Sequence, residues 1–347
     1  MELKLRLASV DSIRLIAILS VIAIHTRPFS LSSEEFNSLY YYLDLTINQL
    51  ARFAVPFFFA ISGYFYGVKV NKGACPLLTA KKMLLKLTIL YLGWCLIYFM
   101  PYNLSMIYEY GFLGPVKVAY WNLNNAINAP LNFIFQGSKV HLWFLASLIL
   151  CTSITAIFVK INAIPALFVV SLALYIIGVL AKSYSATELG LEIEFNTRNG
   201  PFFGMLLFVT GYWLSSKTPT ERWFHLGWII FLLGVLTHFA EIYILMKVYK
   251  TSMLQDFVFG TYFMGVGATL LSLSNHKVLS NKMFATLGKM TLGIYASHFI
   301  FVDLLRPLDK LLNHPLWELF FVVLVLGLSV AFTKLLSKSK YTKKLVE

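Results

Sequence analysis

Residues 11–28 read "DSIRLIAILSVIAIHTRP", and this stretch decides the fold class. Ten residues separate Arg14 from His25, and nine of them are apolar, the exception being Ser20. With its flanks at 8–27, the run has the roughly 20 residues that a membrane-crossing helix needs. The sequence therefore predicts a first membrane helix that carries an ionisable residue at each end of its apolar core.

The composition extends this prediction to the whole chain. Of its 347 residues, 58% are hydrophobic and only 13% are charged, and the mean hydropathy is +0.72. Soluble domains contain about 25% charged residues. We therefore expect an all-α integral membrane protein, with residues 1–347 forming a single polytopic membrane domain and no separate soluble domain. The net charge of +13 fits basic cytoplasmic loops better than nucleic-acid binding.

Apolar stretches long enough to be candidate spans occur ten times. The predicted spans are 8–27, 49–68, 84–101, 141–159, 163–181, 201–216, 224–246, 254–273, 287–305 and 315–336. With the N-terminus inside, the cytoplasmic side collects 19 of the 29 basic residues but only 4 of the 16 acidic ones. This asymmetry predicts about ten transmembrane helices with both termini in the cytoplasm.

Two longer segments, 28–48 and 102–140, fall on the opposite side. The second contains "YWNLNNAINAPLNF" (120–133). Its aromatic and amide side chains suit sugar binding, but they are equally typical of a membrane interface. Both interpretations stay open from the sequence.

The spacing within the first helix places its ionisable residues on one face. Eleven residues at 100° each return almost to the starting direction, so Arg14 and His25 share a face, which Asp11 joins. At 1.5 Å per residue the two lie roughly 16 Å apart along the axis, about half the hydrocarbon core. Arg14 could extend its charge to the inner headgroups and His25 could lie in the outer interface. Alternatively, both point into the bundle and mark a functional site.

These residues resemble a known family. "DSIRLIA", with Arg14 eleven residues before His25, resembles the first-helix signature of the membrane-bound acyltransferase-3 family. Further stretches are similar to its later motifs in order: "RFAVPFFFAISGYFYG" (52–67), "KKMLLKL" (81–87), "HLWFLASLIL" (141–150), "FFGMLLFVTGYWL" (202–214) and "LGIYASHFIF" (292–301). The chain resembles most the stand-alone bacterial O-acetyltransferases of surface glycans, such as that of enterobacterial common antigen.

The resemblance implies an O-acyltransferase in the bacterial cytoplasmic (inner) membrane. Such an enzyme moves an acyl group, usually acetyl from cytoplasmic acetyl-CoA, to a hydroxyl of an extracytoplasmic glycan or lipid-linked oligosaccharide. The expected donor-binding residues are Arg14, Lys82 and Lys86, with Asp11 beside Arg14. The family commonly has arginine where this chain has Lys82 and Lys86, and lysine binds phosphate without the two-point geometry of guanidinium.

His25 and Arg14 are the expected catalytic residues, with Arg14 at the donor end. Imidazole can accept the hydroxyl proton near neutral pH, or can itself carry the acyl group, and the sequence does not choose between the two. The expected substrate-binding residues are Arg52, Ser62, Tyr64, His141, Trp143, Tyr295 and His298. Of these, Ser62 could equally be a small packing residue, and His141 an interfacial anchor.

Other patterns predict structure rather than chemistry. His238 and Glu241, and likewise Asp303 and Arg306, are three residues apart and are expected to pair on their helices. "GVGAT" (265–269) is expected to be a close helix contact. No metal-binding or disulfide spacing is visible. The main rival function is secondary transport of a small acid, and a lipid or a small molecule is a further possible acyl acceptor.

Overall fold

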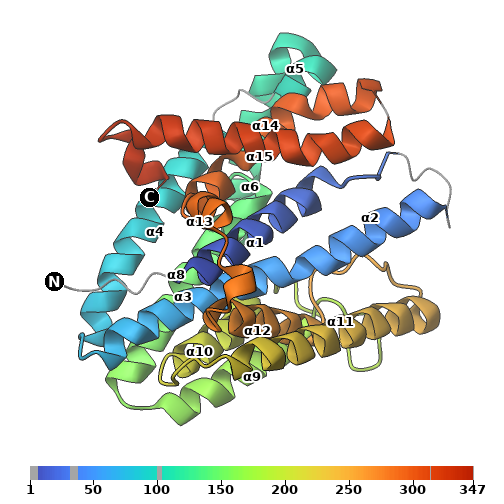
Figure 1. The fold of residues 1–347 in the computed structure, drawn as a ribbon. Coiled ribbons are helices and arrows are strands. Elements are labelled where there is room, and N and C mark those ends of the chain that lie inside the picture. Colours follow the sequence, from blue (N-terminus) through green and yellow to red (C-terminus); the bar gives the residue numbers. More distant parts are fainter. Residues whose placement is uncertain (1–6, 32–37, 100–103, 313, 347) are drawn as a thin grey trace.

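The chain folds as a bundle of helices in the computed structural model, which describes residues 7–31, 38–99, 104–312 and 314–346 (Figure 1). Within those ranges there is no β-strand. The α-helices are α1 (Ala8–Thr26), α2 (Leu39–Leu50), α3 (Ala54–Asn71), α4 (Pro76–Phe99), α5 (Leu104–Tyr110), α6 (Gly114–Asn128), α7 (Pro130–Gln136), α8 (Trp143–Lys160), α9 (Ile164–Leu180), α10 (Pro201–Leu214), α11 (Arg222–Tyr249), α12 (Phe259–Leu273), α13 (Lys282–Gly288), α14 (Thr291–Leu312) and α15 (Pro315–Ser337). Short 3₁₀ turns are η1 (Ala51–Phe53), η2 (Gly111–Leu113), η3 (Val140–Leu142), η4 (Lys277–Leu279) and η5 (Thr342–Leu345).

Helices occupy all ten stretches that the sequence predicts as spans. Six of the described helical segments are long and apolar enough to cross a membrane: α1, α2–α3, α4, η3–α8, α11 and α15. The apolar helices α9, α10 and α12 are shorter, and α14 belongs to neither group. The helical, membrane-protein character is thus confirmed, while the count of ten spans and the sidedness stay predictions. Glu2, Lys4, Arg6 and Glu347, which enter the predicted charge asymmetry, lie outside the described residues.

One long segment, 39–71, changes its winding in the middle. Between α2 and α3 the chain forms the 3₁₀ turn η1, and Pro56 follows shortly after it. Proline has no N–H to donate to the carbonyl four residues earlier, which here belongs to Arg52. The tighter turn therefore occurs where the regular helical bond cannot form, and Arg52 lies within it.

Helix α1 lies in the middle of the bundle. It contacts α3, α12, α13, α14 and α15, while α11 packs along α12, α3 along α10, and α4 along α8. Figure 1 shows α14 and α15 on one side of α1, and α10, α12, α11 and α9 beyond α3 on the other. Residues on α1 are consequently enclosed from several directions.

Glycines allow the close approach of helices at two of these contacts. A Cβ on Gly63 of α3 would lie 1.9 Å from the backbone oxygen of Phe208 on α10, and one on Gly267 of α12 would lie 2.5 Å from the backbone nitrogen of Phe231 on α11. Small residues at such points let helix backbones approach closely in a membrane. The interpretation of "GVGAT" as a helix contact is therefore confirmed.

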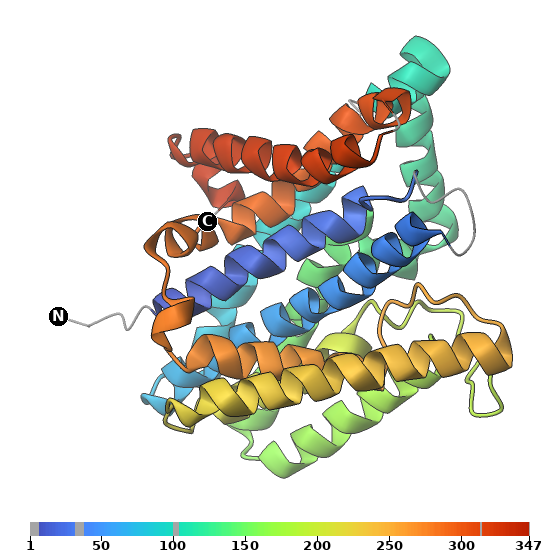
Figure 2. The same ribbon diagram turned by 45° about the vertical axis from the view of Figure 1, so that its right-hand side comes forward.

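The bundle has two distinct ends. We call the end where α1 begins, and where α13 lies, the inner end, and the end where α1 finishes the outer end; the names follow the topology that the sequence predicts. Figure 2 shows α6, in green-blue, running across the outer end instead of along the long helices. The outer end is thus partly covered by the segment that contains "YWNLNNAINAPLNF".

Candidate active site

Three histidine rings meet near the outer end. His25 comes from the last turn of α1, His141 from η3 and His298 from the middle of α14. The ring centroid of His298 is 5.5 Å from that of His25 and 5.0 Å from that of His141. Phe299 lies against all three rings, with centroids 4.5–5.0 Å away. We call His25, His141 and His298 the histidine cluster.

Backbone carbonyls fix the tautomers of two of these rings. Nδ1 of His298 lies 2.6 Å from the carbonyl oxygen of Tyr295, and Nε2 of His141 lies 3.4 Å from that of Ala296. Because a carbonyl can only accept, each of these nitrogens is assigned the hydrogen. The other nitrogens, Nε2 of His298 and Nδ1 of His141, are then acceptors, and both are buried without a hydrogen-bond partner among the described residues. Two buried proton acceptors therefore lie next to His25.

His25 itself is half-buried, and its ring makes no hydrogen bond to the described part of the chain. Its backbone is held instead: the guanidinium of Arg306 donates to the carbonyl oxygens of His25 at 2.8 Å and of Thr26 at 3.2 Å. A cation at the last carbonyls of a helix stabilises that end. Arg306 thereby fixes the end of α1 while the His25 ring stays accessible.

An apolar slot opens at the inner end. It has a volume of about 320 Å³ and its walls include Phe58, Ile61, Met83, Leu87, Phe144 and Leu148. Basic side chains lie along it: Arg14 from α1, Lys86 from α4 and Lys289 from the turn before α14. Arg14 is held by Asp11, whose Oδ1 is 3.0 Å from Nη1, and its guanidinium lies 5.3 Å from the ring centroid of Phe65.

Tyr295 connects this slot to the histidine cluster. Its side chain lines the slot, and its hydroxyl donates to the backbone oxygen of His141. Its ring centroid is 5.4 Å from that of His141 and 5.4 Å from that of Phe144, which lines the slot beside it. One side chain thus contacts both the slot and the cluster.

A polar pocket of about 240 Å³ lies on the outer side of the cluster. Its lining includes Tyr98, Trp121, Asn122, Asn125, Gln136, Ser138, Lys139 and Asp303. The ring of Tyr98 stands perpendicular to that of His141 at 5.2 Å, and Lys139 lies 5.0 Å from the Phe299 ring. The side-chain amide nitrogen of Asn122 is buried, and no described residue accepts a hydrogen bond from it. The pocket therefore offers aromatic surface and amide groups next to the cluster.

The residues predicted from the sequence are only partly brought together. Arg14, Lys86, Ser62 and Tyr295 line the slot, and His25, His141 and His298 form the cluster. Lys82 is exposed and is not among the residues lining the slot. Tyr64 is buried in the packing of α3. Trp143 packs on Phe203 and on the guanidinium of Arg198.

Of the two predicted i, i+3 pairs, that of His238 with Glu241 is wrong. Both nitrogens of the His238 ring lie 3.0 Å from side chains of other elements, those of Thr261 and Gln49. Glu241 accepts from the backbone N–H groups of Phe259 and Gly260, at 3.1 and 2.6 Å, and so caps α12. In the other pair, Asp303 binds Lys139 at 2.5 Å and the charge of Arg306 also acts on it, while Arg306 donates to the end of α1.

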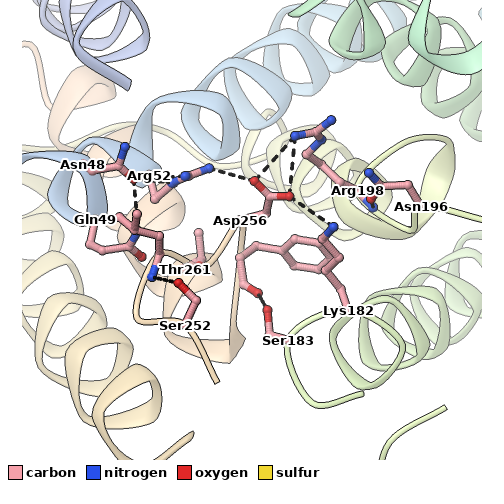
Figure 3. A network of polar contacts seen from close by, with 12 residues as sticks. Asn48, Gln49, Arg52, Lys182, Ser183, Asn196, Arg198, Ser252, Asp256 and Thr261 are labelled. Carbon is pink, nitrogen blue, oxygen red and sulfur yellow. Dashed lines mark hydrogen bonds and ion pairs between the residues drawn. The ribbon is translucent and has the colours of Figure 1, made fainter. Parts of the chain in front are cut away.

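A second charged group, unforeseen from the sequence, lies around Asp256 in the loop between α11 and α12 (Figure 3). Its carboxylate contacts Nη1 of Arg52 at 3.0 Å, and Nζ of Lys182 and Nη1 of Arg198 at 3.5 Å each. Burial acts to raise the pKa of Asp256, but the three cations outweigh it and lower that pKa to about 2. We call these four residues the Asp256 cluster. It brings together three separate segments, the turn η1, the α9–α10 loop and the α11–α12 loop, so no local spacing could have predicted it.

Comparison with known proteins supports one family. A model of the acyltransferase domain, the family named from the sequence motifs, matches residues 7–335, nearly the whole chain. No solved structure matches.

Two curated relatives from Enterococcus faecalis are similar over part of their length. Both are named amino-acid racemase; one is 29% identical over 62% of this chain and 29% of its own length, the other 28% identical over 67% of this chain and 33% of its own. The chain thus spans about a third of the length of the curated relatives it matches. The finer resemblance to the O-acetyltransferase of enterobacterial common antigen has no counterpart in these comparisons.

Proposed function

The chain belongs to the acyltransferase-3 family, and we propose that it transfers acetyl from cytoplasmic acetyl-CoA to a hydroxyl of a surface glycan or lipid-linked oligosaccharide. The family membership supports acyl transfer at a membrane. The donor, the acceptor, the bacterial inner membrane and the residue roles are parts of the proposal.

The observation that carries the proposal is the position of Tyr295. It lines the slot that begins among cations at the inner end, and it contacts His141 in the histidine cluster. A donor held in the slot and an acceptor held on the outer side would therefore approach the same group of imidazoles. A carrier of a small acid needs no such meeting of two different ligands.

The slot suits a phosphate-bearing thioester. Acetyl-CoA has phosphates at one end and a long, thin, uncharged arm that ends in the thioester. Lys86 and Lys289 are exposed at the inner end, where they and Arg14 would attract the phosphates. The apolar walls would receive the arm and direct the thioester towards Tyr295.

The outer pocket suits a sugar. Trp121 offers an aromatic face, and Asn122 and Asn125 offer amide groups that can both donate and accept. The unpartnered amide nitrogen of Asn122 would gain a hydrogen bond from a sugar oxygen. This arrangement favours sugar contact over a purely interfacial role for the 120–133 segment.

Two chemical routes use the histidine cluster. In the first, His25 accepts the hydroxyl proton, the hydroxyl oxygen attacks the thioester carbonyl, the C–S bond breaks, and the proton passes to the leaving thiolate. In the second, a nitrogen of His25 displaces the thiolate and carries the acetyl group to the hydroxyl, whose proton goes to a neighbouring imidazole. The acceptor nitrogens of His141 and His298 lie where they could receive that proton.

The test uses inside-out membrane vesicles that contain the native glycan and receive acetyl-labelled acetyl-CoA. Wild type is compared with His25→Ala and with His225→Ala, an exposed histidine on the first turn of α11 that serves as a matched control. We expect alkali-labile label on the glycan in wild type and His225→Ala only. Label in His25→Ala at the wild-type level would remove His25 from the chemistry, and absence of label in all three would overturn the proposed reaction.

The names of the curated relatives favour a second acceptor. Amino-acid racemases act on amino acids, so a small amino acid is a candidate acyl acceptor for this chain as well. The same vesicles, supplied with free amino acids in place of glycan, would then yield a labelled small product. The racemase activity itself is not carried over, because the similarity covers about a third of those proteins.

A further inference from the structure

The Asp256 cluster has more positive than negative charge. Arg52, Lys182 and Arg198 share the single carboxylate of Asp256, so the four side chains carry a net charge of +2. The side chains of Arg52 and Arg198 are only 15% and 16% exposed. Cations held together at such low exposure repel one another and lose hydration, which an anion can relieve.

The hydrogen-bonding capacity of the cluster is also incompletely used. Two of the contacts to Asp256, from Lys182 and Arg198, are long at 3.5 Å. Within the part of the chain that the structure describes, Nε of Arg198 is buried without a hydrogen-bond partner, and the next residue, Asn199, is fully buried with neither polar atom of its side-chain amide bonded. Arg198 therefore retains donors that Asp256 does not satisfy. Buried donors of this kind are normally bonded, and a ligand would satisfy them.

The cluster lies close to the proposed chemistry. Arg198 stacks on Trp143, with its guanidinium carbon 5.2 Å from the ring centroid, and Trp143 is two residues after His141. The charges of Arg52 and Arg198 also act on the His25 ring. A molecule anchored at the cluster would thus extend towards the imidazoles.

We propose that Arg52, Lys182 and Arg198 bind an anionic group, a carboxylate or a phosphate, of the acyl acceptor. Asp256 fixes the positions of the three cations. The incoming anion bonds to the donor groups that do not face Asp256. Anionic acceptors would then be preferred over neutral ones of the same shape. The inference rests on the proposed function only for calling the bound molecule an acceptor.

Binding is measured without any donor, so that its outcome is independent of acyl transfer. The purified full chain in uncharged detergent is titrated calorimetrically with methyl glucuronide, glucose 1-phosphate and neutral methyl glucoside. We expect about tenfold tighter binding of at least one anionic sugar than of the neutral sugar. Preference for the carboxylate would indicate an acidic sugar, and preference for the phosphate a phosphate-linked acceptor.

Charge variants connect the preference to the cluster. Lys182→Met and Arg198→Gln should each remove most of the preference, whereas Lys247→Met, which removes an exposed charge near the end of α11, should keep it. Asp256→Asn, with one negative charge fewer, should bind the anionic sugar more tightly. Equal binding of neutral and anionic sugars by wild type, or a preference that survives Lys182→Met and Arg198→Gln, would overturn the inference.

Discussion

The two ends of the bundle hold their cations in different ways. At the inner end, Lys86 and Lys289 are exposed along the rim of an apolar slot. At the outer end, Arg52 and Arg198 are largely buried and are fixed by Asp256. An exposed lysine is a hydrated, mobile charge that can follow a flexible polyphosphate, while buried guanidiniums offer a fixed geometry. Under the proposed function, the inner end would attract the donor and the outer end would select the acceptor.

The largest effect is expected between the two ends, in the histidine cluster. His298→Ala removes the buried acceptor nitrogen nearest to His25, and we expect kcat for acetyl transfer to fall about a hundredfold or more. The KM for acetyl-CoA should change little, because His298 lies beyond Tyr295 as seen from the slot. Initial rates in vesicles, at matched protein levels, measure both constants. An unchanged kcat would mean that His298 takes no part in the reaction and that His25 acts without it.

The contribution of Asp256 to the stability of the outer end should be present at neutral pH and lost in acid. The pKa of Asp256 is lowered from 3.8 to about 2 in the folded chain, so its stabilisation is complete above about pH 4 and is lost as the pH falls towards 2. The shift corresponds to about 2 kcal/mol. Thermal unfolding in detergent of wild type and Asp256→Asn should therefore differ at pH 6 and converge near pH 2. A difference that is constant with pH would contradict this assignment.

Substitutions at the inner end are expected to change the binding of the donor, not the stability of the protein. Lys86→Ala and Lys289→Ala should each raise the KM for acetyl-CoA several-fold, about three- to tenfold, with kcat unchanged. Because these side chains are exposed, the effect should shrink as salt is added. Rates measured at low and high ionic strength test this. A fall in kcat with unchanged KM would place the two lysines in a different role.

The smallest effect is expected at Lys82. The sequence motif groups it with Lys86, but its side chain is exposed and is not among the residues that line the slot. Lys82→Ala should alter the KM for acetyl-CoA by less than about twofold. A change as large as that of Lys86→Ala would mean that the donor phosphates extend beyond the slot.

The sequence was sufficient where the signal is local or periodic. Hydrophobic runs located the ten helical stretches, and the interval from Arg14 to His25 placed these two residues towards opposite ends of α1, as the structure has them. The contact of Asp11 with Arg14 also follows from helical spacing. These features depend only on residues within one helix, whose geometry is known in advance.

Contacts between distant elements could not be obtained in this way. The Asp256 cluster joins three separate segments of the chain, and Lys139 contacts Asp303 across 164 positions of sequence. In a single sequence nothing distinguishes a polar loop residue that turns into the bundle from one that faces water. The predicted pairing of His238 with Glu241 failed for the same reason, since a neighbour on the same helix competes with partners that only the tertiary fold supplies.

The position of Tyr295 also affects whether protons could leak through the bundle and dissipate the membrane potential. Tyr295 and Phe144 are both almost completely buried, and their rings pack together at the end of the slot. A continuous file of water from the slot to the outer pocket would leak protons and dissipate the electrochemical gradient. An uncharged thioester arm can reach this plug without opening such a file. Acyl transfer built on this plan would be electrically silent, because the acetyl group that leaves the donor is replaced by the proton that leaves the acceptor hydroxyl, and no net charge crosses the membrane.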